Sequence, residues 1–94
     1  MIEVLEKIRE TYGGADLALC EKAYEFAKKA HANQKRASGE EYFTHPCNVA
    51  KILIDLGLDA ATIAAAFLHD VIEDTPVSEG DIKAEFGDEV LQLV

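Results

Sequence analysis

The sequence has little of three features that would place it in other classes of protein: cysteine, long apolar runs and basic residues. Its two cysteines, Cys20 and Cys47, form no CxxC pair, so we expect buried thiols in a reducing compartment rather than a disulfide framework. The longest apolar run, residues 63–68, is far below the roughly 20 residues of a membrane span. The first residues lack the basic flank and apolar stretch of a secretory signal. These absences predict a cytoplasmic protein with no membrane attachment.

The charge balance argues against nucleic acid as a partner. There are 18 acidic and nine basic residues, a net charge of −9, whereas phosphate contacts along a nucleic acid need a basic face. Five of the nine basic residues nevertheless lie within residues 22–36, which contain one acid: Lys22, Lys28, Lys29, Lys35 and Arg36. This segment suits a small anionic ligand better than a long polyanion. The alternative is a solvated helix face whose lysines serve solubility.

The apolar pattern predicts one small all-α domain, residues 1–94, with no good strand. We expect helices at residues 1–11, 17–32, 46–57, 60–75, 79–87 and 89–94, with a polar loop at 33–44. Caps or a proline are expected to begin five of the helices: Asp16 the second, Pro46 the third, Asp59 the fourth, Ser78 with Asp81 as a capping box the fifth, and Asp88 the sixth. Glycine or proline is expected to end four of them: Gly13 and Gly14 the first, Gly57 the third, Pro76 the fourth and Gly87 the fifth.

The fourth expected helix changes character along its length. It is almost entirely apolar up to Leu68, as in a buried helix, and then carries His69, Asp70, Glu73 and Asp74. Spacings of four residues place these side chains on one side of the last turns. Three carboxylates there repel one another near the negative end of the helix dipole. A bound divalent cation would offset both costs, although a helix that simply becomes polar as it reaches the surface remains the alternative.

A second histidine strengthens the case for a metal. His45 precedes Pro46 at the start of the third expected helix, a rigid entry point that would fix the direction of its imidazole. With His69 and Asp70 it gives mixed nitrogen and oxygen ligands, which suit Mn, Fe or Zn rather than Ca. A single histidine at a helix start is more often a cap or a packed surface residue, but the adjacent His-Asp pair makes His45 a reasonable ligand.

Three motifs in order resemble the hydrolase domain of the RelA/SpoT family. Residues 30–46 read AHANQKRASGEEYFTHP, residues 64–75 read AAAFLHDVIEDT, and Phe86-Gly87 follows. A His-Asp pair alone is common, whereas these three motifs in this order are specific to the family. The resemblance covers roughly residues 17–94. It implies an all-α helical bundle of the HD-domain type.

The resemblance also implies an activity, which is the metal-dependent removal of the 3′-pyrophosphate from guanosine tetra- or pentaphosphate. The products are GDP or GTP and pyrophosphate. The site residues it implies are His45, His69 and Asp70 as ligands of a divalent metal, usually Mn²⁺; Glu73 and Asp74 as catalytic groups that activate or orient the attacking water; and Arg36, Lys35 and Ser38 as substrate-binding residues, with Arg36 against the guanine. A metal can lower the pKa of bound water, and a planar guanidinium suits stacking on a purine. His31 also matches the pattern, but we interpret it as structural.

The chain departs from the family pattern at three points. Ala37 stands where a basic residue is common, and Glu41 replaces a frequent proline. The family's fourth metal ligand is an aspartate that would lie beyond Val94. We therefore expect residues 1–94 to be the N-terminal part of an HD domain, truncated after about six helices. Such a fragment should hydrolyse its substrate very slowly or not at all, and should self-associate through exposed core.

Two other functions stay open at this level. One is an HD phosphohydrolase that acts on another nucleotide, which a substrate panel would distinguish by its lack of preference for the 3′-pyrophosphate. The other is a non-catalytic truncated HD module with a regulatory or dimerising role, which metal content and turnover would distinguish. The resemblance is compatible with two kinds of parent protein, a long bifunctional synthetase and hydrolase or a small stand-alone hydrolase.

Overall fold

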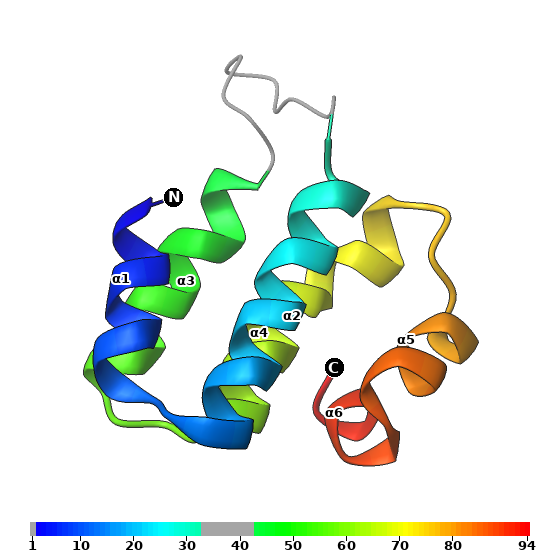
Figure 1. Cartoon of the computed structure of the whole chain (residues 1–94). Helices are drawn as coiled ribbons and strands as arrows, with labels where there is room; N and C mark the ends of the chain where they lie inside the picture. The colour runs from blue at the N-terminus through cyan, green and yellow to red at the C-terminus, as the bar shows by residue number, and fades with distance from the viewer. Residues whose placement is uncertain (1, 33–42) are drawn as a thin grey trace.

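Six helices form in the two ranges, residues 2–32 and 43–94, that this computed structural model describes. Their bounds are α1 (Ile2–Thr11), α2 (Gly14–Ala30), α3 (Thr44–Asp55), α4 (Ala60–Asp74), α5 (Glu79–Phe86) and α6 (Asp88–Leu93). Within these ranges there is no strand, so the predicted all-α fold is confirmed. Figure 1 shows α1 and α3 at one side of the bundle, α2 and α4 in the middle, and α5 and α6 at the other side.

Side-chain caps fix the starts of α4 and α5, as the sequence predicts. Asp59 Oδ1 accepts a hydrogen bond from the amide of Thr62 at 3.0 Å, and hydrogen bonding to the Thr62 side chain and then to its amide holds the pKa of Asp59 below its ordinary value. Ser78 Oγ accepts from the amide of Asp81 at 3.2 Å, and the Asp81 carboxylate accepts from the amide of Ser78 at 3.1 Å. Each cap satisfies amides that have no partner inside the helix.

Two glycines end helices in conformations that side chains disfavour. Gly57 (φ 80°) follows α3, where its amide donates to Ile54 and the next amide, of Leu58, donates to Leu53. These two bonds are the Schellman pattern. Gly87 lies at φ 88° and ψ 172°, a region essentially limited to glycine, and it turns the chain from α5 into α6.

Three predicted helix starts are wrong. The second helix begins at Gly14, because the preceding glycine is extended and acts as its N-cap, so Asp16 lies inside the first turn and Gly14 does not end the first helix. Pro46 is the third residue of α3, not the first, which is tolerated because first-turn amides have no intrahelical partner. Asp88 is the first residue of α6, and Gly87 holds the cap position.

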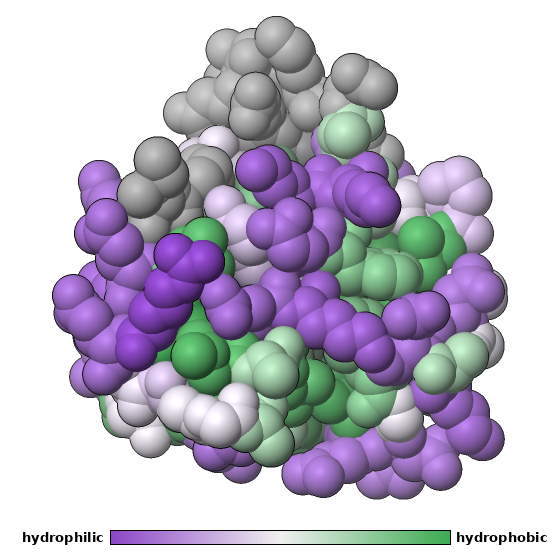
Figure 2. Space-filling view, viewed as in Figure 1, coloured by the Kyte–Doolittle hydropathy of each residue, from purple (hydrophilic) through white to green (hydrophobic). Residues whose placement is uncertain are grey.

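The most deeply buried helix is α4, which packs against α2, α3 and α6. Its buried residues are Ala60, Ile63, Ala64, Ala65, Phe67, Leu68 and Val71. Small alanines alternating with large side chains let neighbouring helices approach closely. Figure 2 shows that the outside of the same view is mostly hydrophilic, with apolar patches between the polar side chains.

Three aromatic rings hold the second half of α4 against α2 and the start of α3. Phe67 is fully buried, with its ring centroid 5.8 Å from that of Tyr24 and 6.3 Å from that of Phe43. The Tyr24 and Phe43 centroids are 5.2 Å apart in an edge-on arrangement, which is favourable for aromatic pairs. Phe43 immediately precedes α3, so this cluster fixes the beginning of α3 next to the polar end of α4.

Ion pairs join α1 to the charged side of α3. Lys51 Nζ lies 3.2 Å from Glu3, and Lys7 Nζ lies 2.7 Å from Asp55. Exposed pairs of this kind add little to stability, but they show that the two charged residues of α3, Lys51 and Asp55, face α1.

Both cysteines are free thiols in the core, as predicted. Burial raises the pKa of Cys20 and of Cys47 to about 11. Among the helices described, none is long and apolar enough to cross a membrane.

Candidate metal centre and active site

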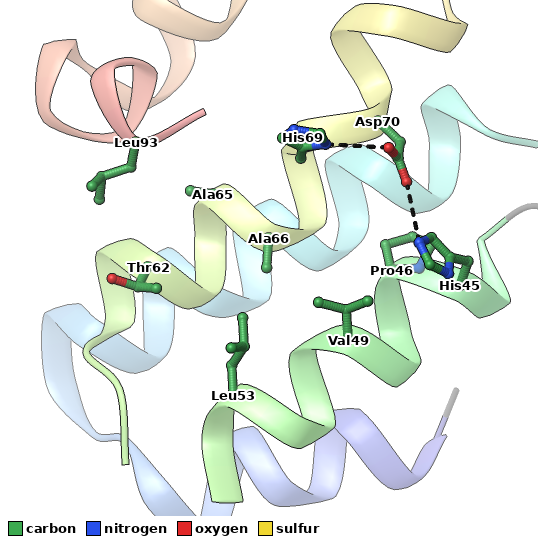
Figure 3. A pocket seen from close by; sticks show the side chains of 10 residues that line it. All are labelled: His45, Pro46, Val49, Leu53, Thr62, Ala65, Ala66, His69, Asp70 and Leu93. Atoms are coloured by element: carbon green, nitrogen blue, oxygen red, sulfur yellow. Dashed lines mark hydrogen bonds and ion pairs between the residues drawn. The ribbon is translucent and has the colours of Figure 1, made fainter. Parts of the chain in front are cut away.

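The packing of α3 on α4 brings three predicted ligands together. His45 lies in the first turn of α3, while His69 and Asp70 lie near the end of α4. His69 Nδ1 is 3.2 Å from Asp70 Oδ1, and His45 Nε2 is 3.9 Å from Asp70 Oδ2. The carboxylate therefore lies between the two imidazoles, with one oxygen toward each (Figure 3).

The 3.2 Å separation between His69 and Asp70 fits a coordination sphere, whereas the 3.9 Å separation between His45 and Asp70 is wider and would have to shorten around an ion. Nitrogen and oxygen ligands lie about 2.0–2.2 Å from a metal such as Zn, so neighbouring ligand atoms are about 3.0–3.5 Å apart. The side chains of His45 and His69 are 49% and 57% exposed, whereas that of Asp70 is 19% exposed. An ion could thus enter from solvent and find the carboxylate already in place. The donor set, two imidazoles and a carboxylate, is typical of first-row transition metals.

Glu73 lies close to the same group. One potential ligand atom from each of His69, Asp70 and Glu73 falls within 4.8 Å of the other two, because the first and last are one helical turn apart. Asp74 is exposed and belongs to the same turn, but the compact group comprises the other three. Glu73 is therefore the better placed of the two predicted catalytic carboxylates.

A pocket of about 400 Å³ runs between α3 and α4 from this centre. Its residues are His45, Pro46, Val49, Leu53, Thr62, Ala65, Ala66, His69, Asp70 and Leu93. Figure 3 shows the polar group at one end and mostly apolar side chains along the rest, with Thr62, and Leu93 of α6, away from that group. A pocket with a few polar groups at one end of an apolar wall is typical of small-molecule sites.

A smaller hollow of about 160 Å³ lies on the other side of His69, where α4 meets α5 and α6. Glu73, Glu79 and Ile72 line it with His69, and Leu91 and Val94 close it. Sequence reasoning gave no role to Glu79, because an acid in the first turn of a helix is already explained by the helix dipole. No signal in the sequence alone could have placed it beside His69.

The remaining predicted residues fall into two cases. Arg36, Lys35 and Ser38, the predicted substrate-binding residues, lie outside the described residues. His31 is 2% exposed at the C-terminal end of α2, where its amide donates to Ala27 at 3.0 Å. That burial agrees with the structural interpretation of His31.

Comparison with known proteins identifies relatives over nearly the whole chain. A GTP pyrophosphokinase (rsh) from Brucella ovis is 48% identical over 92 residues, covering 98% of this chain and 12% of that protein. A probable guanosine-3′,5′-bis(diphosphate) 3′-pyrophosphohydrolase from Mycoplasma pneumoniae is 42% identical over 92 residues, covering 98% and 13%. A guanosine-3′,5′-bis(diphosphate) 3′-pyrophosphohydrolase from Aquifex aeolicus is 53% identical over 74 residues, covering 79% and 11%.

The chain thus spans only about 12% of the length of its relatives, so their names describe much larger proteins. A family model described as an HD domain matches residues 23–94, a range that contains the α3–α4 centre. This chain therefore belongs to the HD-domain family and is similar to the RelA/SpoT enzymes.

Proposed function

We propose that this HD domain takes part in the divalent-metal-dependent hydrolysis of the 3′-pyrophosphate of guanosine tetra- or pentaphosphate, with Mn²⁺ as the metal. The observation that carries most weight is the meeting of His45, His69 and Asp70 at the junction of α3 and α4. The substrate is supported by the relatives named as guanosine-3′,5′-bis(diphosphate) 3′-pyrophosphohydrolases.

The three side chains have separate tasks in this proposal. His45 and His69 supply neutral nitrogen ligands, and Asp70 supplies an anionic oxygen between them. A bound divalent metal would polarise a phosphoryl oxygen and lower the pKa of a water molecule. Because Asp70 is largely enclosed while both histidines are half exposed, substrate would approach from the imidazole side.

Glu73 and Asp74 would act on the attacking water. The water oxygen bonds to the phosphorus attached to the 3′ oxygen, the bond between that phosphorus and the 3′ oxygen breaks, and a proton reaches the 3′ oxygen. The products are GDP or GTP and pyrophosphate. Glu73, whose carboxylate lies beside the His69–Asp70 pair, is the group we assign to accepting the water proton. Asp74, one position on, would orient the water.

Arg36, Lys35 and Ser38 would bind the nucleotide. Arg36 would stack its guanidinium on the guanine, which a lysine could not do, and Lys35 and Ser38 would contact phosphate oxygens. All three positions fall within residues 33–42, outside the described residues, so these roles stay predictions. The cytoplasmic location, and the assignment of residues 1–94 to the N-terminal part of a longer HD domain, stay predictions as well.

A single-turnover assay tests the proposal. The chain in excess over guanosine tetraphosphate, with Mn²⁺, should release pyrophosphate and GDP slowly but measurably above the protein-free rate. Asp70→Asn, which removes the anionic ligand, should return the rate to background. GTP, which lacks the 3′-pyrophosphate, should not be cleaved. Equal cleavage of GTP would indicate another nucleotide substrate, and release that is independent of Asp70 would overturn the proposed site.

A further inference from the structure

We propose that Glu79 positions the attacking water, on the side of His69 that faces away from the α3–α4 pocket. This inference rests on the proposed function and adds a residue to it. His69 lines two hollows: the pocket of about 400 Å³ between α3 and α4, and the hollow of about 160 Å³ where α4 meets α5 and α6. We call the second one the α4–α5 hollow. Its polar residues are His69, Glu73 and Glu79.

The turn between α4 and α5 holds Glu79 at this hollow. The Thr75 hydroxyl donates to the carbonyl of Val71 at 2.6 Å and accepts from the amide of Val77 at 3.2 Å, so the chain leaves α4 in a fixed direction. The capping box then starts α5, and the fully buried Ile82 anchors that helix in the core. The position of Glu79 therefore follows from the fold, although its side chain is exposed.

The charges of the α4–α5 hollow suit water and disfavour phosphate. Among the described residues, its lining includes two carboxylates and neither a lysine nor an arginine, so it repels a polyphosphate ion. Within the same part of the chain, the Glu79 carboxylate has no hydrogen bond or ion pair, which leaves its oxygens free to accept from water. The hollow has room for a few water molecules, since one occupies about 30 Å³ of the liquid.

The α3–α4 pocket suits phosphate instead. Its one carboxylate among the described residues is Asp70, whose charge a bound metal would offset. A phosphate group could therefore enter from that side while water enters from the other. In phosphoryl transfer the attacking and leaving oxygens lie roughly in line with the phosphorus, so they reach it from opposite sides. Two hollows on different sides of His69 meet this requirement.

Glu79 is a positioning residue in this arrangement. Its carboxylate accepts a hydrogen bond from the water and takes no proton, because Glu73, which lies beside His69 and Asp70, accepts the proton. The water oxygen still bonds to the phosphorus, and the bond from phosphorus to the 3′ oxygen still breaks. Loss of Glu79 should therefore slow the attack while metal and nucleotide remain bound.

Single-turnover kinetics of the 94-residue chain with guanosine tetraphosphate and Mn²⁺ test this role. Glu79→Leu, which removes the acceptor at similar size, should lower the maximal rate about tenfold, the lower end of what outer-shell residues contribute. The chain concentration that gives half of that rate should not rise, because a repulsive charge is lost rather than a binding group. Glu79→Asp should recover part of the rate. Glu89→Leu, at an exposed position in the first turn of α6, is the matched control and should behave as the native chain.

Electron spin echo spectra of Mn²⁺ bound to the chain in D₂O give a readout that does not depend on turnover. Deuterons of water ordered in the α4–α5 hollow should modulate the echo of the native chain. Glu79→Leu should weaken this modulation, whereas Glu89→Leu should not.

A lower rate at unchanged half-saturation, with weaker deuteron modulation and unchanged circular dichroism in Glu79→Leu, supports the inference. A native rate in this variant, a rate lost together with substrate affinity, or an unchanged modulation overturns it and leaves the proposed function intact. Turnover that does not depend on Asp70 overturns the proposed function, and this inference with it.

Discussion

Replacing Asp70 by asparagine should remove most of the stabilisation that a bound metal gives to the folded chain. Asp70 is the one anionic member of the proposed ligand set, and its two oxygens face His69 and His45 at 3.2 and 3.9 Å. Asparagine keeps the shape but not the charge, so the loss of affinity should reach about a hundredfold, the upper end of what supporting residues of metal sites contribute.

The expected size follows from linkage between binding and folding. At a metal concentration about 100 times the dissociation constant, binding to the folded state alone stabilises it by about 2.7 kcal/mol. For a domain of this length each kcal/mol shifts the Tm by about 4–8 °C, so the shift should be about 10–20 °C. A hundredfold weaker site at the same concentration gives only about 0.4 kcal/mol, or about 2–3 °C.

Thermal unfolding followed by circular dichroism, with and without Mn²⁺, provides the comparison. Each variant is compared with itself without metal, so any loss of stability caused by the substitution alone cancels. Asp74→Asn is the matched control, because it makes the same change one turn further along α4 and should retain the full shift. A full shift in Asp70→Asn, or an equal loss in both variants, would show that Asp70 is not a ligand.

Three further predictions concern the core, the reaction and the thiols. Phe67→Ala should lower the free energy of unfolding in urea by about 3–5 kcal/mol, because the ring is fully buried between two others; a loss under about 1 kcal/mol would contradict the packing described. Glu73→Gln should lower turnover far more than substrate binding, and equal effects on both would indicate a binding role. Burial raises the pKa of Cys20 and Cys47 from 9.0 to about 11, so the unfolded chain loses those protons at lower pH than the folded chain does. The contribution of the two thiols to the free energy of unfolding should therefore be fully present below pH 9 and decrease between pH 9 and 11. Replacing both cysteines with alanine should flatten this part of the pH profile.

Local signals in the sequence predicted the helix ends that depend on one side chain. Asp59 and the Ser78–Asp81 pair are caps whose effect lies within three residues, and both were predicted correctly. The starts of α2 and α6 were wrong because a glycine took the cap position in place of the predicted acidic residue, three positions before Asp16 in α2 and directly before Asp88 in α6. At such places two residues compete for one role, and local propensity does not decide between them.

The part of the site that lies on one helix could be predicted from the sequence, whereas the part that depends on packing between two helices could not. The spacing of His69, Asp70 and Glu73 follows from one helix, so their closeness could be stated from the sequence. The approach of His45 depends on how α3 packs against α4, which the aromatic contacts of Phe43 and Phe67 determine. The sequence contains those rings but not their mutual position, so the 3.9 Å approach required the structure.

The ligand set itself can be measured directly by electron spin echo spectroscopy of Mn²⁺ bound to the chain with ¹⁵N-labelled histidine. The chain has three histidines, and the proposed centre uses two of them. The native chain should show two coupled imidazole nitrogens, and His45→Gln and His69→Gln should each show one. Absence of nitrogen coupling in the native chain, or two couplings remaining in His45→Gln, would contradict a centre built from α3 and α4.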